Sequence, residues 1–136
     1  MNRVPTSELF CAEDGLTYHG SEPFTGVKYG LRADGTLAGE VEFLDGLRSG
    51  IARSWYPNGR LSEEVHYLLD VAHGLWREWE SDGTLVVEQE HEFGILLWER
   101  QRGEDGEMAE VYRLNEGDPD FAALRELRAQ YGGSPR

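Results

Sequence analysis

Three glutamates alternate with other residues in one stretch of the chain, at Glu88, Glu90 and Glu92. Carboxylates grouped in this way can bind calcium or work as a paired acid and base. On a β-strand, however, alternate residues point to one face about 7 Å apart, which is too open to form a cage around an ion. The pattern therefore favours a solvated or partner-facing acidic strand, and we expect no catalytic residue in it.

Other side chains capable of chemistry are sparse. The histidines are His19, His66, His73 and His91, and Cys11 is the single cysteine. One cysteine excludes an internal disulfide and a thiolate metal site, and we expect Cys11 to be a buried small apolar residue. The sequence has no nucleophile elbow, phosphate-binding glycine loop or paired metal motif. We therefore predict no enzyme activity, no cofactor and no metal site.

The strongest pattern in the chain is a repeat of about 24 residues. It is marked by Asp-Gly or Asn-Gly pairs at 34–35, 58–59, 82–83 and 105–106. Such pairs favour two-residue type I′ turns at the tips of hairpins, and second turns are expected near Asp45-Gly46, Leu69-Asp70 and Phe93-Gly94. A fixed period of this size indicates stacked copies of one unit. The sequence predicts an all-β fold, in which an antiparallel meander of stacked β-hairpins forms an elongated twisted sheet of about eight strands.

A single repeat domain over residues 1–136 accommodates this pattern, since the chain is too short for two comfortable domains. We expect an N-terminal segment at 1–25 with a strand near 9–12 or 16–18, hairpin repeats at about 26–114, and one C-terminal helix at about 119–131. Asp118-Pro119 supplies an N-cap and a first helical residue, and Gly132-Gly133 a stop. The apolar stripe consists of Phe121, Leu124, Leu127 and Tyr131. This helix is expected to cap the array by covering its last repeat or its core face.

The turn spacing also predicts the strand register. With two-residue loops, the numbers of facing residues sum to 117 in the second hairpin and to 165 in the third, so that Arg53 faces Glu64 and Arg77 faces Glu88. Two independent opposite-charge pairs support this register. One face then carries the apolar core, including Leu37, Val41, Phe43, Leu61, Val65, Trp76 and Leu85. The other carries Trp55 and Trp79 beside Glu40, Glu42, Glu64, Glu88 and Glu90.

The mixed face is the predicted binding surface. Because Glu64 and Glu88 are paired to arginines, Glu42, Glu90 and, on an undetermined face, Glu92 are expected to be the freer charges. The candidate partner-binding residues are Glu42, Glu88, Glu90, Glu92, Trp55 and Trp79. For each tryptophan the alternative is a structural role, in which the indole packs on the glycine of the next repeat.

Charge limits the kind of partner. The chain has 26 acids and 13 basic residues, for a net charge of −13, and residues 78–120 alone hold 14 acids and 3 arginines. Such a field repels phosphate backbones and anionic lipids and attracts basic proteins, although acidity can also serve solubility alone. We expect binding to neither nucleic acid nor membranes, and a monomer when unbound. The N-terminus lacks a secretory apolar run, which favours the cytoplasm.

The segment Gly-Leu-Trp-Arg-Glu-Trp-Glu-Ser-Asp-Gly-Thr-Leu at 74–85 resembles the MORN-variant repeat of bacterial proteins. The segment at 14–26 resembles the usual start of that family, and the similarity covers about 14–114. Bacterial proteins built from these repeats are often YwqK-like antitoxins or immunity proteins of polymorphic toxin systems, whereas related eukaryotic repeats serve as scaffolds. The resemblance thus implies a cytoplasmic antitoxin or immunity protein that binds a basic, nuclease-like toxin domain. The alternative is a scaffolding module that inhibits nothing.

Overall fold

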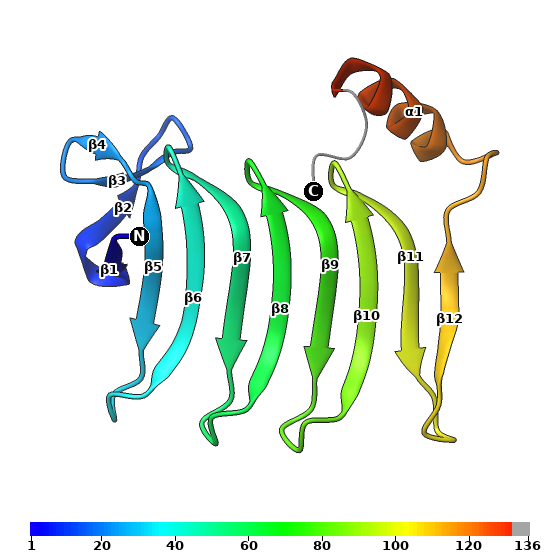
Figure 1. Ribbon diagram of the computed structural model, residues 1–136, viewed down its shortest axis with the longest axis horizontal. Coiled ribbons are helices and arrows are strands. Elements are labelled where there is room, and N and C mark those ends of the chain that lie inside the picture. The colour runs from blue at the N-terminus through cyan, green and yellow to red at the C-terminus, as the bar shows by residue number, and fades with distance from the viewer. Residues whose placement is uncertain (132–136) are drawn as a thin grey trace.

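A long antiparallel meander dominates the structure, a computed structural model that describes residues 1–131 (Figure 1). Its strands are β5 (Gly26–Leu31), β6 (Leu37–Leu44), β7 (Leu47–Trp55), β8 (Leu61–Leu68), β9 (Val71–Trp79), β10 (Leu85–Glu92), β11 (Ile95–Arg102) and β12 (Met108–Arg113), side by side in chain order. A short strand, β1 (Arg3–Pro5), pairs in parallel with β5. The predicted all-β fold is confirmed, including the eight strands between residues 26 and 114.

The N-terminal segment forms a second, small sheet. After a 3₁₀ turn, η1 (Thr6–Glu8), strands β2 (Leu9–Cys11), β3 (Thr17–His19) and β4 (Glu22–Pro23) pair in that order. Both alternative N-terminal strands are therefore present. Cys11 is exposed on β2, so the expectation that it is buried was wrong.

Two kinds of turn alternate along the meander. The turns at Asp45-Gly46, Leu69-Asp70 and Phe93-Gly94 have positive φ at both residues, as a type I′ turn requires. At the Asp-Gly and Asn-Gly pairs, in contrast, only the glycine has positive φ. The Gly59 amide donates to the Tyr56 carbonyl (2.9 Å), and the Tyr56 amide to the Arg60 carbonyl (2.8 Å), which defines a three-residue loop. Our prediction of two-residue type I′ turns at these pairs was wrong.

The side chain of the Asx residue explains the longer loop. Asn58 Oδ1 accepts a hydrogen bond from the Arg60 amide (2.9 Å), and Asp34 accepts from both the hydroxyl (2.7 Å) and the amide (3.0 Å) of Thr36. These bonds lower the pKa of the Asp34 carboxyl, the Thr36 hydroxyl contributing most. An Asx side chain that bonds the backbone two residues on stabilises a turn by itself. Glycine then closes the loop with a bulge.

The predicted register is confirmed through most of each hairpin, with Arg53 opposite Glu64 and Arg77 opposite Glu88. Near the three-residue loops a bulge shifts the pairing by one residue, so that Trp55 faces Leu61 and Trp79 faces Leu85. Facing residues share a side of the sheet. Placing these leucines on the side opposite the tryptophans was therefore wrong, because a single extra residue reverses the side.

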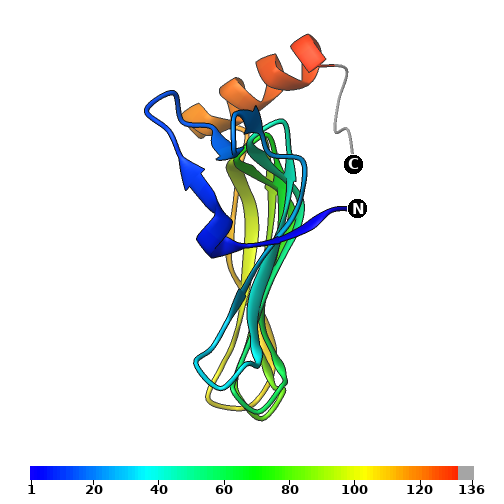
Figure 2. The same cartoon turned by 90° about the vertical axis from the view of Figure 1, so that its left-hand side faces the viewer.

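The large sheet is a single layer (Figure 2). The buried apolar side chains among residues 1–131 are Val4, Phe24, Phe43, Val65 and Leu124. Val4, Phe24 and Phe43 form one cluster, with Leu9 and Val41 packed against it. The predicted core face is therefore buried only in part: Phe43 and Val65 are buried, whereas its other apolar residues are half-buried, because no second layer covers most of the described sheet.

Helix α1 (Pro119–Tyr131) spans the predicted residues and lies across the type I′ turn end of the strands (Figures 1 and 2). It buries Leu124, which is 1% exposed, and Tyr131 contacts the ring of Phe93. The predicted capping helix is confirmed, but it packs on the turn ends of the hairpins, through Glu92 and Phe93, and leaves the edge of β12 and the sheet faces uncovered. The predicted stop at Gly132-Gly133 lies outside the described residues.

Replacing Gly59 tests the three-residue loop. Its φ is +87°, and no atom lies within 4 Å of the position that a β-carbon would occupy, so only backbone strain opposes a side chain. We expect Gly59→Val to lower the free energy of unfolding by about 1–2 kcal/mol, and Gly59→Asn to lower it less because asparagine tolerates positive φ. Thermal or urea unfolding measures both, and equal stability of all three proteins would contradict the assignment.

Removing the buried leucine tests the helix cap. Leu124→Ala should lower the free energy of unfolding by about 2–5 kcal/mol, because it leaves a cavity under the helix. Ala123→Gln, at the adjacent exposed position, is the matched control and should unfold close to the unmodified protein. A small effect of Leu124→Ala in urea unfolding would show that the helix contributes little to the fold.

Candidate protein-binding surface

A row of alternating charges crosses one face of the sheet. We call it the charge ladder; in register order it consists of Glu40, Arg53, Glu64, Arg77, Glu88, Arg100 and Glu110. Arg77 Nε lies 2.8 Å from Glu88, and Arg100 approaches the same carboxylate at 3.3 Å. The Glu88 side chain is only 14% exposed. Glu88, a predicted binding residue, is therefore shared between two arginines and serves chiefly to join three strands.

Two further predicted residues, Glu42 and Glu90, occupy equivalent places on the ladder face. Glu42 accepts a hydrogen bond from the Ile51 amide at 2.5 Å, and Glu90 accepts one from the indole of Trp98 at 3.1 Å. Both carboxylates are half-buried beside a bulge in the next strand. The expectation that they are the freer charges was wrong: the bulge in β7 leaves the Ile51 amide for Glu42, and the bulge in β11 places Trp98 opposite Glu90.

Glu92 is the most buried of the predicted residues, at 2% exposure. Its carboxylate takes both Nε (2.6 Å) and an Nη (2.8 Å) of Arg128 on the helix. These hydrogen bonds raise the pKa of the Arg128 guanidinium. Glu92 therefore anchors the helix to the end of β10, and its prediction as a freer, partner-facing charge was wrong.

Trp55 and Trp79 lie half-buried on the ladder face, close to the three-residue loops. Their backbones link successive repeats: the Tyr56 hydroxyl donates to the Trp79 carbonyl (2.6 Å), and the Arg32 guanidinium donates to the Trp55 carbonyl. Trp79 also lines a shallow hollow with Arg60, Leu61 and Gly83. Gly83 belongs to the loop of Trp79's own hairpin, so this hollow does not correspond to the structural alternative, in which the indole packs on the glycine of the next repeat. Trp79 is half-buried, which leaves part of its surface exposed.

Exposed acids surround this end of the sheet. Glu80, Glu104, Asp105 and Glu107 lie in or beside the last two three-residue loops. Asp105 Oδ1 accepts a hydrogen bond from the Glu107 amide (3.0 Å) within its own loop. Glu80, Glu104 and Glu107 are all exposed. These loop acids were not among the predicted binding residues, because the acids chosen as candidates all lay on strands. The signal for the loop acids was the charge count over residues 78–120.

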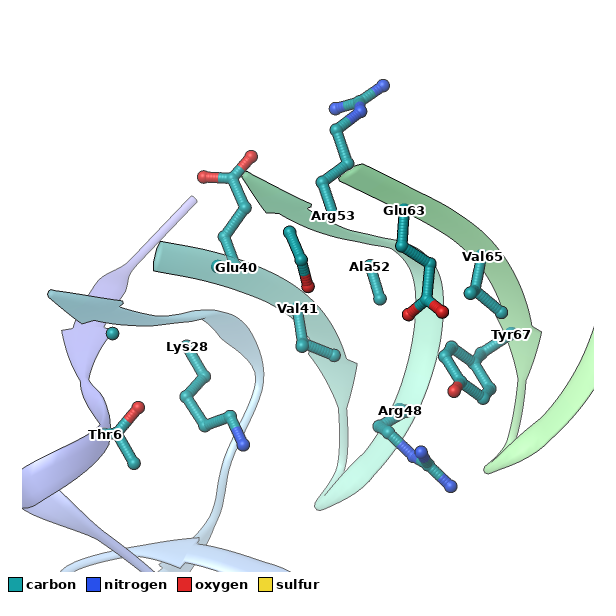
Figure 3. Close-up of a pocket in the computed structure, with 13 residues that line it drawn as sticks. Thr6, Lys28, Glu40, Val41, Arg48, Ala52, Arg53, Glu63, Val65 and Tyr67 are labelled. Atoms are coloured by element: carbon teal, nitrogen blue, oxygen red, sulfur yellow. The ribbon is translucent and has the colours of Figure 1, made fainter. Parts of the chain in front are cut away.

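The opposite, concave face holds a pocket of about 270 Å³ that sequence reasoning also missed (Figure 3). Lys28, Arg48, Tyr67 and Glu63 point into it, whereas Glu40 and Arg53 point away. The Arg48 guanidinium stacks on the Tyr67 ring at 4.3 Å and pairs with Asp70 at 3.1 Å. The floor is formed by small residues, among them Gly39, Ala52 and Ser54.

Electrostatic strain marks the rim of this pocket. Glu63 and Glu78 face one another on β8 and β9. Burial, and secondarily the Glu78 charge, raise the pKa of the Glu63 carboxyl. Like charges directly opposite destabilise a sheet, so this pair works against folding at neutral pH.

Comparisons with protein-family models, with curated proteins and with solved structures found no match. Within residues 1–131, no helix is long and apolar enough to cross a membrane. The same residues contain no group of three or more His, Cys, Asp or Glu side chains placed to hold a metal ion.

Neutralising Glu63 tests the strained pair. Because the pKa of Glu63 is raised on folding, its charged form destabilises the native state, and stability is regained as the pH falls through the folded-state pKa. Glu63→Gln should raise the melting temperature at neutral pH, and this advantage should shrink on acidification. Glu80→Gln, which removes an exposed charge, is the control. Melting curves whose Glu63→Gln advantage is independent of pH would contradict the strain.

Proposed function

We propose that this protein is a non-catalytic antitoxin or immunity protein, which binds and neutralises a basic, nuclease-like toxin domain. The resemblance to MORN-variant repeats suggests this class. The observation that carries the proposal is the group of exposed acids, Glu80, Glu104 and Glu107, in or beside the last two three-residue loops, at the end of the sheet that also carries the half-buried Trp79. Nuclease active sites are basic because they hold phosphates, and a rigid acidic surface complements them.

The surface has the composition expected of an interface that uses electrostatic steering. Charged groups around its margin accelerate encounter with an oppositely charged protein, and aromatic residues commonly supply the contacts that hold a complex together. The proposal assigns no role in binding to four predicted residues, because each carboxylate is committed to a contact inside the protein: Glu42, Glu88, Glu90 and Glu92. The exposed loop acids take their place.

Reversing the loop acids tests the surface. Glu104→Lys with Glu107→Lys should slow association with the toxin about tenfold or more at low salt and weaken its salt dependence. The matched control is Glu13→Lys with Glu22→Lys, an equal charge change at exposed positions of the N-terminal segment. Growth rescue and pull-down on co-expression with basic toxin domains encoded beside the gene, followed by binding kinetics, provide the measurement.

Two results would contradict the proposal. If no such domain is neutralised although a partner is captured, the scaffolding alternative is favoured. If the unmodified protein instead binds duplex DNA or RNA in a salt-dependent manner near physiological ionic strength, the electrostatic argument fails, since a charge of −13 opposes such binding.

A further inference from the structure

The last strand of the sheet, β12, is an open edge. It pairs with β11 on one side, and no strand among residues 1–131 pairs with the other. Five of its six residues are exposed, including Val111 at 56% and Tyr112 at 38%. At the opposite edge of the sheet, β1 covers β5. An uncovered strand edge is a template for pairing with another chain.

The repeat shows what belongs at this edge. Strands β6, β8 and β10 each follow a three-residue loop, as β12 does, and each is then paired by a return strand, β7, β9 or β11. After β12 the chain instead turns, with the Asp118 amide donating to the Asn115 carbonyl (3.0 Å), and enters α1 at the type I′ turn end of the sheet, where β12 finishes. The last repeat of the described array therefore has its first strand, β12, but no return strand.

The charge ladder specifies the side chain that this position would carry. Glu40, Glu64 and Glu88 each face an arginine on the return strand, in turn Arg53, Arg77 and Arg100. Glu110 stands at the same place on β12, opposite Arg100 on its inner side. The next strand of the pattern would therefore present a basic residue to Glu110.

The surroundings of the edge have the matching charge. Residues 103–120 contain seven acids and one basic residue, Arg113. Arg113 itself folds back onto Glu110 at 2.6 Å, with both side chains exposed. Exposed pairs of this kind contribute little, so an arriving cation can replace Arg113. The extra residue at the β11–β12 bulge is no barrier, because bulged internal strands such as β9 and β11 pair on both sides.

We propose that β12 accepts an extended, basic strand of the partner protein, antiparallel to it, with an arginine or lysine opposite Glu110. The incoming strand completes the last repeat in place of a return strand. Main-chain hydrogen bonds supply affinity, and Glu110 selects charge and register. The identity of the donor as a toxin rests on the proposed function, whereas the edge geometry does not.

A synthetic peptide with the sequence of β9, Val71–Trp79, serves as the probe, because its Arg77 already faces ladder glutamates within the sheet. We expect the full-length protein to bind this peptide at millimolar concentration or below, with slower hydrogen exchange at residues 108–113. Glu110→Arg should weaken binding about tenfold, and a peptide carrying Arg77→Glu should restore it to that variant. Glu116→Arg, an equal charge change in the loop beyond β12, should weaken binding less than about twofold.

Equal losses for Glu110→Arg and Glu116→Arg, or a peptide that slows exchange elsewhere but not in β12, would overturn the inference. The exchange measurement on the unmodified protein keeps the test decisive even if Glu110→Arg folds poorly. If a basic toxin is neutralised while β12 exchange is unchanged, the edge inference fails and the proposed function stands. If the peptide adds to β12 but no toxin domain is neutralised, the edge stands and the proposed function fails.

Discussion

Register in this protein depends on the charge ladder. A sheet with one face against a core is held in register by burial, because slipping one residue exposes its apolar set. Here most of the sheet is a single layer, and few of its side chains are buried. The row from Glu40 to Glu110 compensates: Glu64 and Glu88 are only 15% and 14% exposed, and each lies between two arginines. An isolated exposed pair contributes little, but these pairs share partners across strands, and a slip of one strand breaks the pairs on both of its sides together.

The two turn chemistries give the sheet two different ends. Type I′ turns leave short, tight loops that the N-terminal sheet and helix α1 can cover, as the hydrogen bond from the Thr17 amide to the Gly46 carbonyl (2.9 Å) illustrates. The three-residue loops keep their Asx side chains for internal bonds and project their neighbouring residues into solvent. The contact between Glu92 and Arg128 lies at the turn end, whereas the loop end combines contacts between successive repeats, such as that of Tyr56 with Trp79, with exposed acids such as Glu104. The division leaves the loop end available for binding without loss of the contacts that hold the helix.

Sequence reasoning succeeded where local rules act. Glycine spacing located the strands and turns, opposite-charge spacing gave the Arg53–Glu64 and Arg77–Glu88 pairs, and Asp118-Pro119 located the helix start. It failed where one irregular residue or a distant segment decides the outcome. The partners of Glu42 and Glu90 exist because of bulges that a regular register does not contain. The partner of Glu92 is 36 residues away, on a helix whose docking site the sequence left open.

A single-layer array of hairpins ends in an open strand edge, which can pair with other chains unless something protects it. Burying that edge under the terminal helix would stabilise the monomer, but here the helix lies across the turn end, tied to Glu92 rather than to β12. The edge is instead protected by charge, which also limits self-association, because two copies would bring Glu110 and its acidic neighbours together. The same charge admits a basic strand. Among the described residues, Glu110 has no arginine opposite it on the outer side of β12. Its charge thus disfavours pairing between copies and favours pairing with a strand of opposite charge.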